Sequence, residues 1–319
     1  MTRELTSPAR VSAAEFDRLF ESVKNWGRWG SDDELGTLNY VTPETIRAAA
    51  GLVRSGRSVS MAIPINKQAG PDNANPASHF IAMGHDIPVG GGESFGMCFL
   101  GMMSHGDCHT HVDALNHVAY KGRLYNDKDA IATLTSQGSA WGSIAAYADG
   151  IVGRGVLLDA ARHRGVDWLE PGEAVGRAEL EAIEKAEGVE LREGDFLVFR
   201  TGHHARRLAL GPWDNGYPPA GEGKAGLDVD TIPLMHARRI AGFLPDGDGE
   251  TVPGGVEGIP YPIHALQLAA MGMLISDSLQ FEDLARVCVE EGRWEFMVVG
   301  CPLRLPGATG SPWNPIALF

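Results

Sequence analysis

Residues 105–117 read His105-Gly-Asp-Cys-His-Thr-His-Val-Asp-Ala-Leu-Asn-His117, and this stretch holds four of the chain's 11 histidines. Side chains alternate between the two faces of an extended strand, so positions 105, 107, 109, 111 and 113 would share one face. Three imidazoles and two carboxylates are poor core material, because buried polar groups need partners. Both groups bind divalent cations such as zinc or manganese. The spacing therefore favours a metal or catalytic site over a plain His–Asp hydrogen bond.

The bulk composition is ordinary for a globular protein. Hydrophobic residues make up 44% of the 319 residues and charged residues 21%. The net charge of −14 argues against nucleic acid or an anionic membrane as a partner. We find no internal repeat and no convincing linker, so we expect one domain over residues 1–319.

Export and membrane signals are missing from the sequence. The N-terminal residues lack the apolar core of a signal peptide, and no stretch approaches the roughly 18 apolar residues of a membrane span. The four cysteines form no Cys-x-x-Cys pair, and Cys108 alternates away from the histidine face, which predicts packing for it. We expect a cytoplasmic protein with reduced thiols.

Apolar periodicity predicts helices and strands joined by long loops. Ser12-Ala-Ala-Glu15 is a capping box that opens a helix, within an N-terminal helical extension over residues 1–24. Thr42-Pro43 begins a second helix that Gly56 ends. Further helices are expected over 177–186 and 279–291, loops over 68–94 and 211–226, and strands over 57–65, 156–159, 195–200, 240–244, 273–275 and 295–299. This mixture predicts an α/β fold.

Three other segments bear on function. Trp26 and Trp29 lie among glycines, where they either line a ligand pocket or pack their loop on the core. Asp246-Gly-Asp-Gly-Glu250 partly mimics a calcium loop, but Thr251 stands where that loop needs glycine, so we predict a strand-end turn near the active site. The apolar tail from Gly310 to Phe319 predicts docking on its own domain or on a partner in a homo-oligomer.

The motif His111-x-Asp113-Ala-Leu-x-His117 resembles the signature of the cyclase-like family of metal-dependent hydrolases. That family includes bacterial arylformamidase (kynurenine formamidase), isatin hydrolase and trans-dienelactone hydrolase. Further blocks resemble its long branch in the same order, and the likeness covers residues 25–319. These blocks are Trp26-Gly-Arg-Trp-Gly, Leu35-Gly-Thr-Leu-Asn39, Gly194-Asp-Phe-Leu-Val-Phe-Arg-Thr-Gly202, Pro262-Ile-His264 and Gly272-Met-Leu-Ile-Ser-Asp277.

The resemblance implies a swivelling β/β/α fold, assembled as homodimers or homotetramers. It also implies that His111 and Asp113 bind a divalent metal, that His264 and Asp277 are further ligands, and that His117 is the catalytic acid/base. The implied function is metal-dependent hydrolysis of an amide, lactam or lactone in a small cyclic or aromatic substrate. Trp26 and Trp29 would then form an aromatic wall that orients the substrate.

The sequence departs from the family pattern at three positions. The family's first histidine falls on Asp107, for which His109 or His105 could substitute, and we favour His109. Asp277 replaces a glutamate and is one methylene shorter, so it could ligate directly, act through water, or mark a weakened second metal position. Leu115 replaces the proline of the short-form motif, as in the long branch.

Two other functions compete with metal-dependent hydrolysis. One is a metal-free cyclase, dehydratase or isomerase that uses His117 in the same pocket, and the other is a non-catalytic small-molecule binding protein. The sequence contains no Gly-x-Ser-x-Gly elbow and no phosphate-binding glycine motif, so a serine hydrolase and a nucleotide enzyme lack support.

Overall fold

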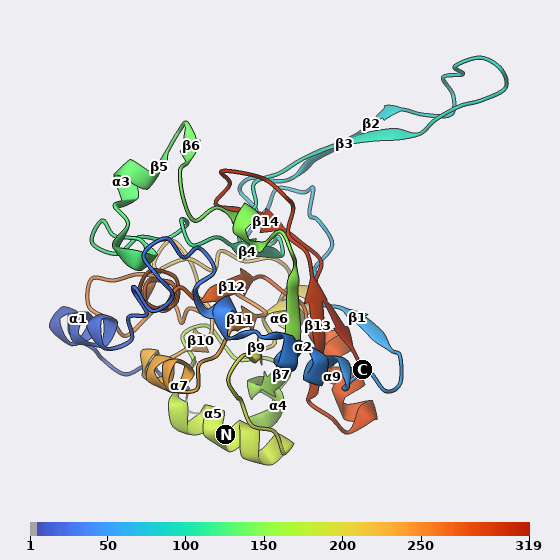
Figure 1. Ribbon diagram of the computed structural model, residues 1–319. Helices are drawn as coiled ribbons and strands as arrows, with labels where there is room; N and C mark the ends of the chain where they lie inside the picture. The colour runs from blue at the N-terminus through green and yellow to red at the C-terminus, as the bar shows by residue number, and fades with distance from the viewer. Residues whose placement is uncertain (1–4) are drawn as a thin grey trace.

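A twisted sheet runs through the middle of the protein (Figure 1). The structure is a computed structural model and describes residues 5–319. Within that range nine strands form the sheet in the order β1-β15-β13-β7-β9-β11-β12-β4-β14. Their bounds are β1 (Ser58–Ser60), β4 (His111–Asp113), β7 (Ile151–Asp159), β9 (Phe196–Arg200), β11 (Gly242–Pro245), β12 (Leu274–Asp277), β13 (Glu295–Gly300), β14 (Gly310–Pro312) and β15 (Ile316–Leu318).

The centre of the sheet is parallel, with β7 beside β9, β9 beside β11, and β11 beside β12. Strands β9, β11 and β12 are buried along their whole length, which is why the sequence shows them as short apolar runs rather than alternating patterns. Antiparallel strands extend the sheet on both sides, β13 and β15 on one side, β4 and β14 on the other. The predicted α/β fold is confirmed.

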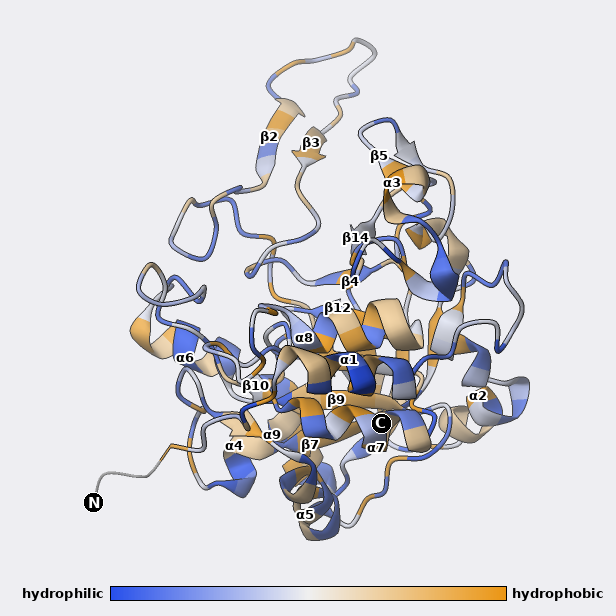
Figure 2. Cartoon of the chain, turned by 90° about the vertical axis from the view of Figure 1, so that its left-hand side faces the viewer, coloured by the Kyte–Doolittle hydropathy of each residue, from blue (hydrophilic) through white to orange (hydrophobic). Residues whose placement is uncertain are grey.

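Helices cover both faces of the sheet. Helices α1, α5, α7 and α8 pack on the face that carries Leu197 and Phe199, and Figure 2 shows them in front of the strands. Helix α9 packs on the opposite face with Phe196 and Val198. None of the helices in residues 5–319 is long and apolar enough to cross a membrane. The helix bounds are α1 (Ala13–Ser22), α2 (Pro43–Ala50), α3 (Ala130–Thr133), α4 (Ala160–His163), α5 (Arg177–Glu187), α6 (His203–Leu210), α7 (Ile232–Ala237), α8 (Pro262–His264) and α9 (Glu282–Glu291), with single-turn or irregular helices η1 (Gly36–Tyr40), η2 (Tyr125–Asp127), η3 (Ile144–Tyr147), η4 (Val229–Thr231) and η5 (Ala265–Met271).

The helix starts predicted at Ser12 and Thr42 are confirmed by their caps, whereas the helix predicted from residue 279 begins at Glu282. The Ser12 side chain accepts from the Glu15 backbone and completes the capping box of α1. Thr42 caps α2 with Pro43 in its first turn, but α2 ends at Ala50 and not at Gly56, because Gly51 already closes it. Gly188 closes α5 in the left-handed conformation, at φ 68°.

The extended strand predicted for residues 105–113 is wrong over its first half. Only His111–Asp113 forms a strand, β4, whereas residues 105–110 form turns and irregular chain. Strand β4 lies between β12 and β14, which pair with it only at residues 111–113. A ladder needs a partner for each residue, so the alternation of faces does not continue back to position 105. Cys108 is buried, as predicted.

The loop predicted for residues 68–94 contains a hairpin. Strands β2 (Ser78–Met83) and β3 (Met97–Gly101) pair antiparallel and project from the body of the molecule (Figures 1 and 2). We call this hairpin, residues 78–101, the arm. The residues that favour turns lie at the tip of the arm, at Gly90 to Gly92. Because they fall in the same segment, they led to the prediction of a loop where the strand residues before them form β2.

Residues 262–271 form a helix that the sequence analysis did not identify. Helix α8 continues directly into η5, and every residue of both is buried. A helix that is apolar on all sides shows no 3.6-residue periodicity, so the usual signal is missing. Helix α8 carries His264 into the site.

The C-terminal tail docks on its own sheet. Strands β14 and β15 bring the tail into the sheet, and the Phe319 side chain is fully buried. The Phe319 backbone N–H donates to the Arg57 carbonyl at 2.9 Å. Docking of the tail is confirmed, and the homo-oligomer stays a prediction that needs another surface.

Glu187 is a buried carboxyl at the end of α5. Its Oε1 accepts from the Asp159 backbone N–H at 3.3 Å, while its Oε2 has no hydrogen-bond partner within residues 5–319. Burial, together with the nearby Asp159 carboxylate, raises the pKa of Glu187 to about 8. The folded protein therefore keeps this group protonated at neutral pH.

We expect Glu187→Gln to stabilise the protein increasingly as the pH rises from 4.5 to about 8, and so already at neutral pH. The unfolded chain releases this proton near pH 4.5, so the stability from Glu187 is complete below pH 4.5 and is lost as pH rises through about 8. The variant should raise the free energy of unfolding at pH 8 by roughly 2–4 kcal/mol and change it little at pH 4.5. Urea unfolding at both pH values measures this, with Glu181→Gln, on a side chain 40% exposed, as control. An equal gain at both pH values would contradict the assignment.

Candidate metal centre

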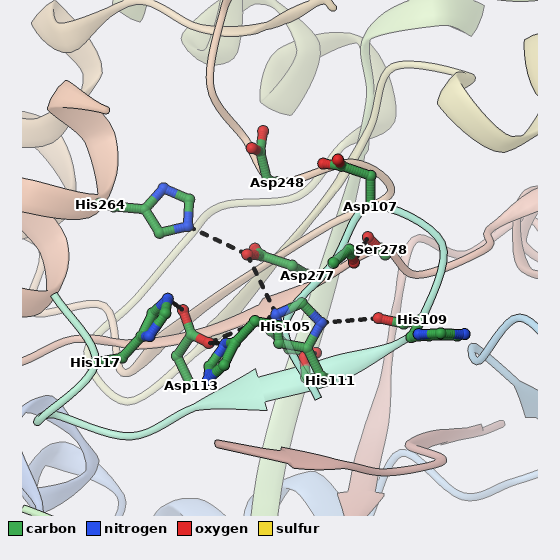
Figure 3. A network of polar contacts seen from close by, with 12 residues as sticks. His105, Asp107, His109, His111, Asp113, His117, Asp248, His264, Asp277 and Ser278 are labelled. Atoms are coloured by element: carbon green, nitrogen blue, oxygen red, sulfur yellow. Dashed lines mark hydrogen bonds and ion pairs between the residues drawn. The ribbon is translucent and has the colours of Figure 1, made fainter. Parts of the chain in front are cut away.

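A cavity of about 290 Å³ opens where β4 and β12 meet the turn after β11 and the start of α8. Figure 3 shows the polar side chains that converge on it. The lining residues are His105, Gly106, Asp107, His111, His117, Val118, Asp248, Tyr261, His264, Asp277 and Ser278. The cavity thus combines four elements, of which β4 is distant in sequence from the other three.

We call His111, Asp113 and Asp277 the floor of the cavity; His111 and Asp277 line it, and Asp113 is buried beside His111. Strand pairing places Asp277 of β12 directly opposite His111 of β4. His111 Nε2 lies 3.6 Å from Asp113 Oδ1 and 3.9 Å from Asp277 Oδ2. His111 Nδ1 is 2.8 Å from the His109 carbonyl, and donation to that oxygen leaves Nε2 free to act as a ligand. All three side chains are buried.

A second group surrounds Asp113 from the other side. His105 Nδ1 lies 3.0 Å from Asp113 Oδ1, and His117 Nε2 lies 3.9 Å from Asp113 Oδ2. The rings of His105 and His117 stack with centroids 3.7 Å apart and planes 2° apart. His105 Nε2 is also 2.9 Å from the Thr309 hydroxyl, which holds the ring in place.

His264 connects two carboxylates at the wall of the cavity. Its Nδ1 lies 2.9 Å from Glu250 Oε1 and its Nε2 lies 3.1 Å from Asp277 Oδ2. Glu250 also accepts from the His264 backbone N–H at 2.8 Å and so fixes the start of α8. The turn 246–250 therefore lies at the end of β11 beside the cavity, as the sequence predicts.

Three predicted site residues point elsewhere. His109 Nε2 lies 3.1 Å from the Asn66 carbonyl, and Figure 3 shows its ring away from Asp113. Trp26 and Trp29 do not line the cavity in the described chain, and they pack around the Tyr125 cluster. Trp26 Nε1 donates to the Ala269 carbonyl at 2.7 Å, and the Trp29 ring lies edge-on to Tyr40 at 5.0 Å. Both tryptophans therefore fit packing of their loop on the core, and the aromatic wall predicted from them stays a prediction.

Burial controls the electrostatics of the site. Burial lowers the pKa of His117 to about 4, against the opposing effect of Asp113. Burial also raises the pKa of Asp277 to about 6, against the effect of His264. For His264 burial disfavours the charged form, but Asp277 and Glu250 outweigh it and raise the pKa well above its usual value. At neutral pH His117 is thus uncharged and can accept a proton.

The floor residues fit a divalent cation. Both carboxylate oxygens of Asp113 and the Oδ1 of Asp277 lack hydrogen-bond partners in the described part of the chain. Buried carboxylate oxygens that accept no hydrogen bond are costly unless a cation compensates them. Donor atoms about 2.1 Å from a shared tetrahedral cation lie about 3.4 Å apart, close to the spacing between His111 Nε2 and Asp113. The donor set of imidazole and carboxylate suits zinc or manganese.

Comparison with known proteins places this geometry in a family. The model of the Cyclase family, described as "Putative cyclase", matches residues 40–248, well over half of the chain. The chain belongs to the Cyclase family. A crystal structure described as a novel cyclase is 32% identical to this Cyclase-family chain, with a TM-score of 0.81. That alignment covers 94% of this chain and 99% of the other.

Two isatin hydrolases share the Cyclase-family fold. Isatin hydrolase A from Ralstonia solanacearum is 20% identical, with a TM-score of 0.57 over 87% of this chain and 98% of its own. Isatin hydrolase A from Labrenzia aggregata, solved with benzyl benzoate, is also 20% identical, with a TM-score of 0.58 over 85% and 97%. A comparison with curated proteins gives no match. The family and the swivelling fold expected from the resemblance are confirmed.

Several cavity residues of this Cyclase-family protein were missed by the sequence analysis. Tyr261 and Ser278 line the cavity, and Asp248 faces it from the turn after β11. Buried Lys224 contacts Asp248 and lies 3.5 Å from Asp107 Oδ1, so Asp107, whose side chain is 40% exposed, takes part in this ion-pair group. The acidic turn was a signal for Asp248 and Glu250, whereas no pattern in the sequence marks Lys224 or Tyr261.

Proposed function

We propose that this Cyclase-family protein is a metal-dependent hydrolase. Its substrate would be a small, cyclic or aromatic molecule whose amide, lactam or lactone bond is cleaved. The observation that carries the proposal is the floor of the cavity, where His111, Asp113 and Asp277 converge and both oxygens of Asp113 and Oδ1 of Asp277 accept no hydrogen bond from the described residues. His117 lies next to this floor without belonging to it.

The proposed metal ligands are His111, Asp113 and Asp277, with His264 beside them. We propose His105, which contacts Asp113, for the role for which the sequence favoured His109, whose ring contacts Asn66. A zinc or manganese ion held there would activate water and polarise the scissile carbonyl. Glu250 supports the set, because a carboxylate on His264 Nδ1 orients Nε2 toward Asp277.

His117 is the proposed acid/base. Its lowered pKa keeps the ring uncharged at neutral pH, so Nε2 can take a proton from the attacking water. The same atom can then deliver that proton to the leaving nitrogen or oxygen. Stacking against His105 fixes the plane of the ring, which limits the directions in which the proton can move.

The other expected properties accompany this proposal. We propose a small-molecule substrate, no nucleic-acid or membrane partner, a cytoplasmic location and a homodimer or homotetramer. The isatin hydrolases act, by their names, on isatin. We propose the same class of reaction, hydrolysis, for this chain, but we do not propose isatin as its substrate.

A metal-free reaction is the second candidate. His264 already lies between Glu250 and Asp277, so part of the site is satisfied by hydrogen bonds alone. A cyclase, dehydratase or isomerase could use His117 in that pocket, and a binding protein could use the pocket without chemistry.

Metal content and chelation separate these candidates. We expect protein purified without chelator to hold at least about half an equivalent of zinc or manganese, since such ligand sets bind tightly. A chelator should abolish turnover of cyclic amides and lactones, and the cation should restore it. Protein that stays metal-free after supplementation, or that turns over substrate fully after chelation, would contradict the proposal.

A further inference from the structure

We propose that the ring of Tyr261 is the surface on which this protein binds the planar ring of its substrate. Tyr261 would thereby select substrates for the hydrolysis proposed above, on which this inference rests. Among residues 5–319 it is the only phenylalanine, tyrosine or tryptophan that lines the cavity. The sequence analysis expected an aromatic surface for the substrate, and the structure provides one at a residue that no sequence pattern marked.

The cavity offers little apolar surface besides Tyr261. Its other lining residues in the described chain are four histidines, three aspartates, a serine, a glycine and Val118. Binding sites for organic molecules hold them mainly against hydrophobic and aromatic side chains, with a few polar groups to fix their orientation. The polar groups are plentiful here, so a ring-bearing substrate must take most of its apolar contact from Tyr261.

The Tyr261 side chain is open, although the residues that follow it are buried. Tyr261 is 49% exposed, whereas Pro262, Ile263 and His264 of α8 are buried. An aromatic side chain buries 150–250 Å² when it is covered, so on the order of 100 Å² of Tyr261 is available to a ligand. Folding leaves this apolar area uncovered at the cavity, where a flat molecule can cover it.

Hydrogen bonds fix the backbone on both sides of the ring. The Tyr217 hydroxyl donates to the Pro260 carbonyl, and the Ala265 N–H donates to the Tyr261 carbonyl at 3.1 Å. The Tyr261 ring itself lies edge-on to the His264 ring, with centroids 6.2 Å apart and planes at 83°. A ring that is held in place before binding loses little conformational freedom when a ligand stacks on it.

This position connects the bound ring to the reacting groups. His264, the neighbour of Tyr261, has its Nε2 3.1 Å from Asp277 Oδ2 in the floor of the cavity. Stacked aromatic rings have centroids about 4.5–7 Å apart, so a ring on Tyr261 lies beside His264. A carbonyl attached to that ring can then reach the floor, where the proposed cation and His117 act on it.

Two matched ketones test the proposal without any turnover. Acetophenone and cyclohexyl methyl ketone are both neutral and carry a six-membered ring on a carbonyl, but only the ring of acetophenone is planar and aromatic. Neither contains a bond that a hydrolase cleaves. We expect the full wild-type chain to bind acetophenone about 2- to 10-fold more tightly, the effect of an aromatic pair beyond the area it buries. NMR titration of the ligand signals gives both dissociation constants.

Two variants assign this preference to the ring of Tyr261. Tyr261→Leu keeps an apolar side chain but removes the aromatic ring, so it should bind the two ketones equally well. Tyr261→Phe is the matched control, because it loses only the hydroxyl, and it should keep the preference. Both variants should melt within about 3 °C of wild type, since a half-exposed side chain contributes little to stability.

Four results would overturn the proposal. They are no measurable binding of acetophenone to the wild-type chain; equal affinity of that chain for the two ketones; a preference that persists in Tyr261→Leu; and a preference lost in Tyr261→Phe, which would assign it to the hydroxyl. Metal content is measured separately, so the two proposals can fail independently. A protein that stays metal-free but prefers acetophenone would refute the hydrolase and keep the role of Tyr261, whereas a metal-dependent hydrolase without the preference would do the reverse.

Discussion

We expect His111→Ala to lose metal and hydrolytic activity together. His111 is the only imidazole whose Nε2 lies within 4 Å of both Asp113 and Asp277 in the described chain, and its other nitrogen is fixed by the His109 carbonyl. Without it, two buried carboxylates would have to hold the cation nearly alone. Turnover should fall at least about 10³-fold, because the electrostatic contribution of the cation is lost as well. Elemental analysis and kinetics on the same preparation measure both effects.

His109→Ala is the matched control for this variant. His109 lies two residues away in the same segment and is buried, yet its ring contacts the Asn66 carbonyl and not the floor of the cavity. We expect it to keep its metal and most of its activity, with a lower melting temperature. If His109→Ala lost as much metal as His111→Ala, His109 would be a metal ligand, as favoured from the sequence, and the role proposed for His105 beside Asp113 would be wrong.

The central sheet was predictable because its strands are buried on both faces. Runs such as Phe196–Arg200 are apolar and bounded by residues that favour turns, so the sequence of the segment itself is enough to predict a buried strand. Two elements lacked such a signal. The helix 262–271 is buried on every side, so its sequence shows no helical periodicity. The arm carries exposed apolar residues, and an apolar run is read from sequence as part of the core, which the arm is not.

The site was predictable only where local geometry decided it. His111 and Asp113 belong to a true strand, so alternation placed them correctly on one face. His109 and His105 lie before that strand, where side-chain directions depend on tertiary contacts with Asn66 and Thr309. No rule of spacing can supply such contacts, because their partners are 43 and 204 residues away.

We expect His117→Ala to separate proton transfer from metal binding. The variant should lower kcat by roughly 10²–10⁴-fold, the range for loss of a general acid/base. Metal content should stay near wild type, because His117 Nε2 is 3.9 Å from Asp113 and the floor of the cavity is complete without it. Added imidazole should restore part of the rate, since a free base can occupy the space that the side chain leaves.

The position of His117 would also allow it to be a metal ligand, so the experiment decides between an acid/base role and a ligand role. His105, Asp113 and His117 together form a second group whose donor atoms could hold a cation. If that group were the metal site, His117→Ala would lose metal as fully as His111→Ala, and imidazole would not restore the rate. If His117 were structural, the melting temperature would fall while kcat changed little. The acid/base role requires the remaining pattern, in which kcat falls while metal content and stability are preserved.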